Sequence, residues 1–211
     1  MLPSREEMDR ALRRRAGGEL RDRFKGATAA VCGLGGLGSN IAVSLARAGV
    51  GTLLLFDFDR VDVSNLNRQQ YKAAQVGMEK ALALAENLRE ISPYTALRPY
   101  VVRLTEENVP ELLAEAQVIC EAFDRPEEKS MLVNAVLEKL PDAYLVASSG
   151  MAGLGSANSI RTRRVAGRFY LCGDGVSGVS EETGLFSTRA ALCAAHQAHM
   201  VLRILAGEFD V

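Results

Sequence analysis

The chain has 211 residues, 48% apolar and 24% charged, with a formal net charge of −1 at pH 7, values typical of a globular protein and not of a disordered, fibrous or membrane-spanning one. No apolar run approaches the roughly 18 residues that a membrane-spanning helix needs, and the N-terminus is too charged for a signal peptide, so we expect a cytoplasmic protein. The near-neutral charge makes a nucleic-acid partner unexpected, because such binding rests on a basic face.

The predicted elements alternate between strands and helices. The first 26 residues mix arginines with acids, which predicts a surface or dimer-contact helix; alternatively, one of its arginines reaches a nucleotide site. Next come strands at 27–32, 52–56, 99–103, 118–121 and 144–148, with helices from 37, from about 77 to 91, near 106–116 and at 126–139. Short strands at 159–165 and 169–171, a glycine-rich loop at 173–184 and a closing helix at 185–205 follow.

Continuous apolar strands separated by helices indicate a parallel sheet that is covered on both faces. We therefore predict an α/β fold with a Rossmann-like, mainly parallel sheet and helices on both faces. A short antiparallel C-terminal extension and a closing helix continue it. In domain terms, the prediction is an N-terminal helix over 1–26 and a single domain over 27–211.

A glycine-rich turn lies between a predicted strand and a predicted helix. Residues 33–39 read Gly-Leu-Gly-Gly-Leu-Gly-Ser. In that position backbone amides and the positive end of the helix dipole face an anion, and the missing side chains let phosphate approach. Asp57 ends the next strand, 19 residues beyond Gly38, where ribose hydroxyls would be held. The pattern predicts a nucleotide site; the alternative is a tight structural turn.

Charged residues farther along the chain favour ATP over NAD as the bound nucleotide. Arg68 lies on a polar loop, Lys80 near the start of a helix and Asp124 at the end of a strand, all toward the carboxyl edge of the sheet. Arg68 and Lys80 can neutralise phosphates while Asp124 holds Mg²⁺, which a dinucleotide enzyme does not need. The plainer alternatives are a surface arginine, a solvated helix lysine and an N-cap for the helix at Pro126.

Together these motifs resemble a known family. The matching strings are 33–39, Asp57-Phe58-Asp59, Val63-Ser64-Asn65-Leu66-Asn67-Arg68-Gln69, Gly77 with Lys80, and Asp124. They resemble the ThiF/MoeB/HesA superfamily, the bacterial relatives of ubiquitin-activating enzymes, over about residues 27–206. The short length, the missing zinc cysteines and the segment 173–177 are similar to the shorter ThiF-like proteins of thiamin biosynthesis.

The resemblance implies ATP-dependent adenylation of the Gly-Gly C-terminal carboxylate of a small ubiquitin-like sulfur carrier, ThiS-like, by a homodimer that uses Mg²⁺ and releases pyrophosphate. By the same resemblance, Arg68, Lys80 and Asp124 are catalytic, with Asp124 on the metal. The implied nucleotide contacts are Gly33, Gly35, Gly36, Leu37, Gly38, Asp57 (ribose), Asp59, Asn65, Arg68, Gln69 and Lys80. Catalysis then needs no general base, because a C-terminal carboxylate is already ionised at pH 7.

The chain departs from the family pattern in three places. The N-terminal arginine motif, which in relatives reaches the neighbouring protomer's site, is not recognisable, so the choice among Arg10 and residues 13–15 stays open. Arg125 follows Asp124 directly, and Lys129 holds the later basic position. Ser180 lines up with the crossover cysteine of larger relatives, within the stretch 180–185, so sulfur chemistry at that position is not expected.

The cysteines and histidines give weaker signals. The four cysteines are widely spaced without a C-x-x-C pair, so we expect neither a structural zinc nor a disulfide framework. Cys193 is predicted to be a small buried residue and Cys172 to be more exposed, and a part in sulfur transfer stays open for both. His196 and His199 share a helical face, which favours a buried hydrogen-bonded pair over metal ligands.

Two alternatives to the carrier hypothesis remain. The same ATP chemistry can act on a tRNA base or on another carboxylate, such as that of a MoaD-like carrier. A different class is an NAD-binding or non-enzymatic module that uses only the glycine turn and Asp57; it predicts tighter binding of NAD than of ATP.

Overall fold

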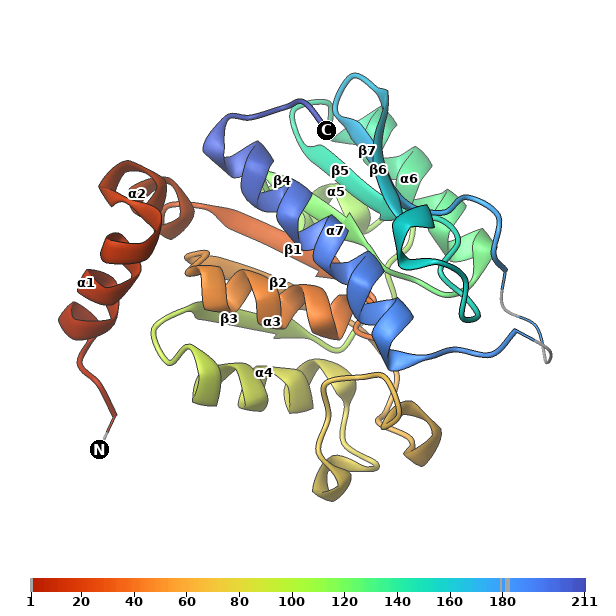
Figure 1. The fold of residues 1–211 in the computed structure, drawn as a ribbon, viewed down its shortest axis with the longest axis horizontal. Coiled ribbons are helices and arrows are strands. Elements are labelled where there is room, and N and C mark those ends of the chain that lie inside the picture. Colours follow the sequence, from red (N-terminus) through yellow and green to blue (C-terminus); the bar gives the residue numbers. More distant parts are fainter. Residues whose placement is uncertain (1, 179, 181–182) are drawn as a thin grey trace.

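A seven-stranded sheet with the order β3-β2-β1-β4-β5-β7-β6 organises the computed structural model, which describes residues 2–178, 180 and 183–211 (Figure 1). All neighbouring strands are parallel except β6, which is antiparallel to β7. The strands are β1 Thr28–Cys32, β2 Thr52–Phe56, β3 Ala96–Tyr100, β4 Val118–Glu121, β5 Tyr144–Ser148, β6 Arg161–Ala166 and β7 Phe169–Gly173. The predicted mainly parallel sheet with an antiparallel extension is confirmed.

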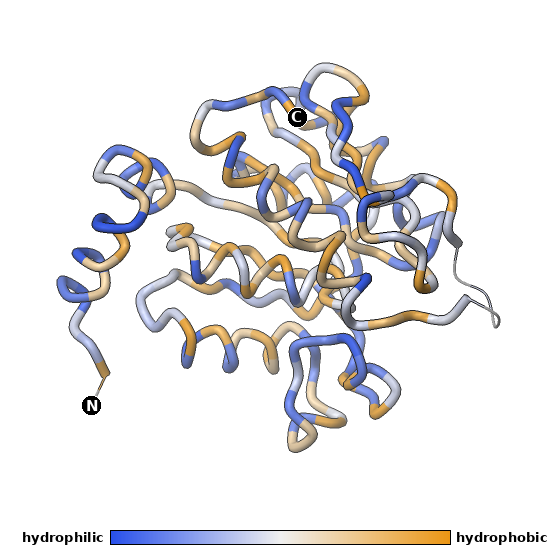
Figure 2. Tube along the Cα trace, in the orientation of Figure 1, coloured by the Kyte–Doolittle hydropathy of each residue, from blue (hydrophilic) through white to orange (hydrophobic). Residues whose placement is uncertain are grey.

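Helices cover both faces of this sheet. One apolar cluster joins residues of α3, α4 and α7 to the strands, and a second joins α5 and α6 to the opposite face. The helices are α1 Arg5–Ala16, α2 Gly18–Lys25, α3 Gly38–Ala48, α4 Lys80–Ile91, α5 Val109–Leu112, α6 Pro126–Lys139 and α7 Ser187–Ala206. Apolar residues follow the strands and the inner helix faces, whereas α1 is mostly hydrophilic (Figure 2). Among the described residues, no helix is both long and apolar enough to cross a membrane.

Several helices and strands begin or end at other residues than predicted. The strand expected at 99–103 is β3, three residues earlier, because its register is set by pairing with β2 and by Tyr100 stacking on Phe56. The helix expected near 106–116 shrinks to the single turn α5. α4 begins at Lys80 and not near Gly77, since Gly77 has a φ of 90° that a helix cannot continue.

The N-terminal segment forms two helices where one was predicted. Gly17 separates them with a φ of 88°, and Ser4 caps α1 by accepting from the amide of Glu7. The buried Arg21 of α2 donates to the carbonyl of Gly49, beyond the C-terminal end of α3, so both helices lie at the amino edge of the sheet. The division of the chain at residue 26 stays a prediction.

Candidate nucleotide site

The glycine turn lies at the carboxyl edge of the sheet, between β1 and α3. A Cβ atom at Gly33, whose φ is 88°, would lie 2.8 Å from the carbonyl oxygen of Ala122. At Gly38 it would lie 1.8 Å from the carbonyl oxygen of Gly33, so both positions require glycine. A Cβ at Gly35 would meet only Gln69 Nε2, at 3.8 Å, and no hydrogen bond within the described residues uses the Gly35 or Gly36 amide. The turn therefore offers free amides on an open side, with the buried Leu37 leading into α3.

Asp57 joins this turn to the end of β2. Its buried carboxylate accepts from the amide of Leu34, at 2.7 Å, and from the amide of Asp59, at 2.8 Å. Burial raises the pKa of Asp57, while the nearby Lys80 and the two amides act in the opposite direction. The structure thus places this carboxylate beside the turn, where its hydrogen bond from the amide of Leu34 holds the backbone of the turn.

The loop between β2 and α4 brings Arg68 against the turn. A Cβ at Gly36 would lie 3.3 Å from Arg68 Cγ, and Asn40 Nδ2 donates to the carbonyls of both Gly36 (2.7 Å) and Arg68 (3.2 Å). Arg68 Nη1 donates to Ser64 O and to Asn67 Oδ1. Although Arg68 follows the turn by about thirty residues along the sequence, these contacts hold the two side by side.

Two neighbours of Arg68 have different surroundings. The side-chain oxygen of the buried Gln69 has no hydrogen-bond partner in the described part of the chain, which is unusual for a buried amide and leaves it available to a ligand. Asn65 Oδ1 instead accepts from the amide of Asp62, at 3.1 Å, and caps a short 3-10 turn. The structure therefore gives Asn65 a local structural contact.

Lys80 is the first residue of α4 and is buried. Its Nζ lies 3.0 Å from Asp59 Oδ2, and 54% of the Asp59 side chain is exposed. The plain interpretation of Lys80 as a solvated helix residue is wrong, because the loop 57–79 folds over the start of α4, where the amide of Lys80 donates to the carbonyl of Asp59. Lys80 and Asp57 are close enough for the lysine to lower the pKa of that carboxyl, so a cation lies near the turn.

Asp124 lies beyond the end of β4 with its side chain exposed. The N-cap position of α6 is occupied by Arg125, with no side-chain capping bond, so the interpretation of Asp124 as an N-cap is wrong. No hydrogen bond within residues 2–178, 180 and 183–211 engages its carboxylate, and no three His, Cys, Asp or Glu of those residues gather as a metal site. One free carboxylate fits Mg²⁺, which commonly takes one or two protein carboxylates and completes its shell with substrate phosphates and water.

Two ion pairs near this edge were not predicted from the sequence. Asp174, after β7, binds Arg189 Nη2 at 2.6 Å, and it also accepts from the hydroxyl and amide of Ser177. Burial alone would raise the pKa of Asp174, but the bonds from Ser177 and Val176 and the charge of Arg189 hold it at about 2.

The second pair joins Glu121 to Lys129. An acid inside an apolar strand is the sequence signal that could have identified Glu121.

The cysteines do not form a reactive group. All four are buried, including Cys172, so the prediction of a more exposed Cys172 is wrong; β7 lies inside the sheet, between β5 and β6. Burial raises the pKa of Cys172 to about 11 and that of Cys193 to about 12, which disfavours the thiolate.

The predicted crossover stretch is only partly described. The hydroxyl groups of Ser180 and Thr183 are hydrogen-bonded, but Glu181 and Glu182 lie outside the described residues.

The histidines are not a buried pair. His196 Nδ1 lies 3.1 Å from Thr162 Oγ1 in a partly buried position, whereas His199 is exposed. The prediction is wrong for His199 because the face of α7 that it occupies does not pack against the sheet.

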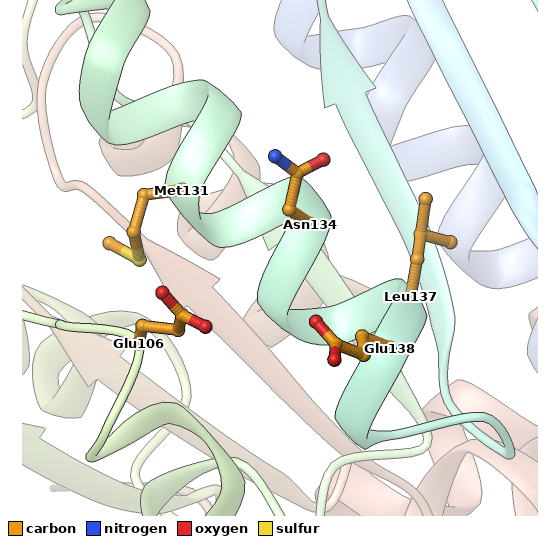
Figure 3. Close-up of a pocket in the computed structure, with 5 residues that line it drawn as sticks. All are labelled: Glu106, Met131, Asn134, Leu137 and Glu138. Carbon is orange, nitrogen blue, oxygen red and sulfur yellow. The ribbon is translucent and has the colours of Figure 1, made fainter.

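A hollow of about 610 Å³ lies elsewhere, against α6. Figure 3 shows Glu106 facing the helix from the loop after β3, with Met131, Asn134, Leu137 and Glu138 along α6. None of these residues belongs to the predicted site.

The N-terminal arginines lie away from the turn of their own chain. Arg13 pairs with Asp9 and Asp22, and Arg21 with Asp9, at the amino edge of the sheet. An N-terminal arginine that contacts a nucleotide at the carboxyl edge would therefore have to come from a second copy.

Known proteins are similar to this chain in sequence. The chain is 39% identical over 126 residues to the sulfur carrier protein adenylyltransferase of Thermus thermophilus, covering 57% of this chain and 46% of that protein. It is 32% identical over 195 residues to the adenylyltransferase and sulfurtransferase UBA4 of Candida glabrata, covering 89% and 44%. The chain thus spans less than half the length of these relatives.

Solved structures show the same fold. The E. coli tRNA N6-threonylcarbamoyladenosine dehydratase TcdA, in complex with AMP, superposes with a TM-score of 0.86 over 98% of both chains at 22% identity. E. coli MccB with ATP gives 0.67 over 89% of this chain and 58% of its own, at 18% identity. The ThiF family model matches residues 8–210. The predicted resemblance is confirmed, and the chain belongs to the ThiF family.

Proposed function

We propose that this chain adenylates the C-terminal Gly-Gly carboxylate of a small ubiquitin-like sulfur carrier, with ATP as co-substrate. The observation that supports this most is the placement of cations beside the glycine turn. The stem of Arg68 packs against Gly36, and the buried Lys80 lies near Asp57 and Asp59. A dinucleotide bound for hydride transfer needs no such charge around it, whereas a triphosphate does.

The chemistry follows from this geometry. The carrier's carboxylate, ionised at pH 7, bonds to the α-phosphorus of ATP while the bond to the bridging oxygen of pyrophosphate breaks. In this proposal the amides of Gly35 and Gly36, which no hydrogen bond among the described residues uses, bind the phosphates, and Arg68 and Lys80 offset the charge that moves onto the departing pyrophosphate. We assign Asp57 and Gln69 to hydrogen bonds with the nucleoside, and the unpartnered side-chain oxygen of Gln69 supports its part in this assignment. Asp124 would hold Mg²⁺, and the ion would supply further charge neutralisation.

The relatives support the substrate class. The Thermus thermophilus protein is named for adenylation of a sulfur carrier, which fits the Gly-Gly substrate proposed here. Our specific proposal is a ThiS-like carrier in thiamin biosynthesis. We also propose a cytoplasmic homodimer, in which the N-terminal arginines of one copy reach the turn of the other, because they cannot reach their own.

The test is ATP–pyrophosphate exchange with purified carriers. We expect exchange only with a carrier that ends in Gly-Gly and none with the same carrier truncated by two residues. A ThiS-like and a MoaD-like carrier tested side by side distinguish the pathways. Absence of exchange with every Gly-Gly carrier would refute the proposal.

A second candidate is ATP-dependent modification of a tRNA base. It is favoured by the match to TcdA over almost the full length of both chains. The net charge of −1 weighs against it, since RNA binding draws on a basic face. A filter-binding titration with bulk tRNA at low salt separates the candidates: micromolar binding supports this one, and no binding removes it.

A further inference from the structure

An ion pair between a buried carboxylate and a partly buried lysine lies beside the segment that carries Asp124. Glu121 is the last residue of β4 and has no exposed surface. Lys129, near the start of α6, places Nζ 2.9 Å from each of its carboxylate oxygens. Buried ion pairs add little net stability compared with apolar residues of the same volume, so stability alone does not account for the pair.

Two further hydrogen bonds of the pair hold one piece of backbone. Glu121 Oε1 accepts from the amide of Phe123 at 2.8 Å, and Lys129 Nζ donates to the carbonyl of Phe123 at 3.0 Å. Lys129 Nζ also reaches Ser148 Oγ, at 3.1 Å, on the neighbouring strand β5. Both polar backbone groups of Phe123, the residue before Asp124, are therefore bound by this one ion pair.

The same segment contacts the glycine turn. A Cβ at Gly33 would lie 2.8 Å from the carbonyl oxygen of Ala122 and 3.0 Å from Phe123 Cδ1. The amide of Ala122 donates to the carbonyl of Cys32, just before the turn. The exposed side chain of Asp124 has no hydrogen bond to the described residues, so the backbone before it decides where the carboxylate lies.

We propose that Glu121 and Lys129 are positioning residues, which hold the Phe123–Asp124 backbone so that the Asp124 carboxylate meets the metal-bound nucleotide at the turn. This inference rests on the proposed function, which assigns Asp124 to Mg²⁺. A misplacement of about 1 Å at a reacting group can cost about a hundredfold in rate, so a geometric role of this kind is measurable.

The test measures binding of a non-hydrolysable ATP analogue by calorimetry, with Mg²⁺ and with EDTA. In the wild-type protein we expect Mg²⁺ to strengthen binding. In Glu121→Gln and Lys129→Met we expect wild-type affinity in EDTA but at least a tenfold smaller gain from Mg²⁺, as in Asp124→Asn. Lys129→Arg, which keeps the cation, should recover most of the gain.

Controls separate positioning from folding. Glu138→Gln removes an exposed carboxylate from the same helix α6 and should leave the gain unchanged. Ser148→Ala is a milder variant that removes one partner of Lys129, and it should reduce the gain with little loss of thermal stability. A normal Mg²⁺ gain in folded Glu121→Gln and Ser148→Ala would overturn the proposal, as would a wild-type protein in which Mg²⁺ has no effect. Because no carrier takes part, failure of carrier adenylation is seen separately, in the exchange assay.

Discussion

The Asp174–Arg189 pair allows a quantitative prediction. In Asp174→Asn, Arg189 loses its anionic partner while 4% of its side chain is exposed, and its Nε already has no partner among the described residues. The shift of the Asp174 pKa from 3.8 to about 2 corresponds to about 2 kcal/mol of stability at neutral pH. Leaving a buried cation unpaired costs about 3 to 5 kcal/mol, so we expect a loss of about 2 to 5 kcal/mol.

The pH dependence has a defined sign. Because folding lowers the pKa of this carboxyl, its contribution is fully present above the unfolded value of 3.8 and is lost as the pH falls through about 2. The difference in unfolding free energy between wild type and Asp174→Asn should therefore be constant from pH 7 to about pH 5 and shrink steadily below pH 4.

Urea unfolding followed by circular dichroism measures both effects. Asp142→Asn is the matched control, because Asp142 also pairs with an arginine, Arg168, but its side chain is 99% exposed. That variant should change stability by no more than about 0.5 kcal/mol. A loss at Asp174 as small as the loss at Asp142, or a difference that does not shrink in acid, would refute the reasoning.

Three further predictions concern the nucleotide site and the buried cysteines. Gly38→Ala should abolish ATP binding and lower the melting temperature, because its Cβ would lie 1.8 Å from the carbonyl oxygen of Gly33; calorimetry and thermal unfolding measure the two effects. Lys80→Met should fold but bind ATP at least tenfold more weakly by calorimetry, since it removes the cation that the proposed function assigns to the phosphates. Cys172 and Cys193 should resist iodoacetamide at pH 7 in the native protein and react after unfolding, as read by mass spectrometry, because burial raises the pKa of both thiols.

Each of these predictions has a control. Gly35→Ala leaves room for its Cβ, which would meet only Gln69 Nε2 at 3.8 Å, so it should keep the melting temperature of wild type. Lys72→Met removes an exposed lysine that pairs with Glu90 and should leave ATP affinity unchanged. Equal ATP affinities for Lys80→Met and Lys72→Met would show that Lys80 does not contact the phosphates. Rapid native alkylation of Cys172 would show that β7 opens in solution.

Local sequence patterns account for most of the fold. Apolar strands, the glycine turn and the amphipathic helices predicted the mainly parallel sheet with its antiparallel extension, because these features depend on spacing within short stretches of chain. The ends of a strand were predicted less accurately where pairing with a neighbouring strand decides them. For example, β3 begins three residues before the predicted start because pairing with β2 sets its register. The break at Gly17 that splits the N-terminal segment into two helices was also not predicted.

Long-range contacts decided the rest of the site. The sequence alone pointed to the turn, Asp57, Arg68, Lys80 and Asp124, because residue type and spacing carry the chemistry of a nucleotide site. Only the tertiary structure shows that Lys80 is buried and that the N-terminal arginines lie at the opposite edge.

The same holds for the ion pair between the buried Glu121 and Lys129, next to Asp124. It joins the end of a strand to the following helix and to a serine on the next strand. The energy of a buried charge depends on which groups surround it in space, and neighbours of that kind are brought together only by the folded chain.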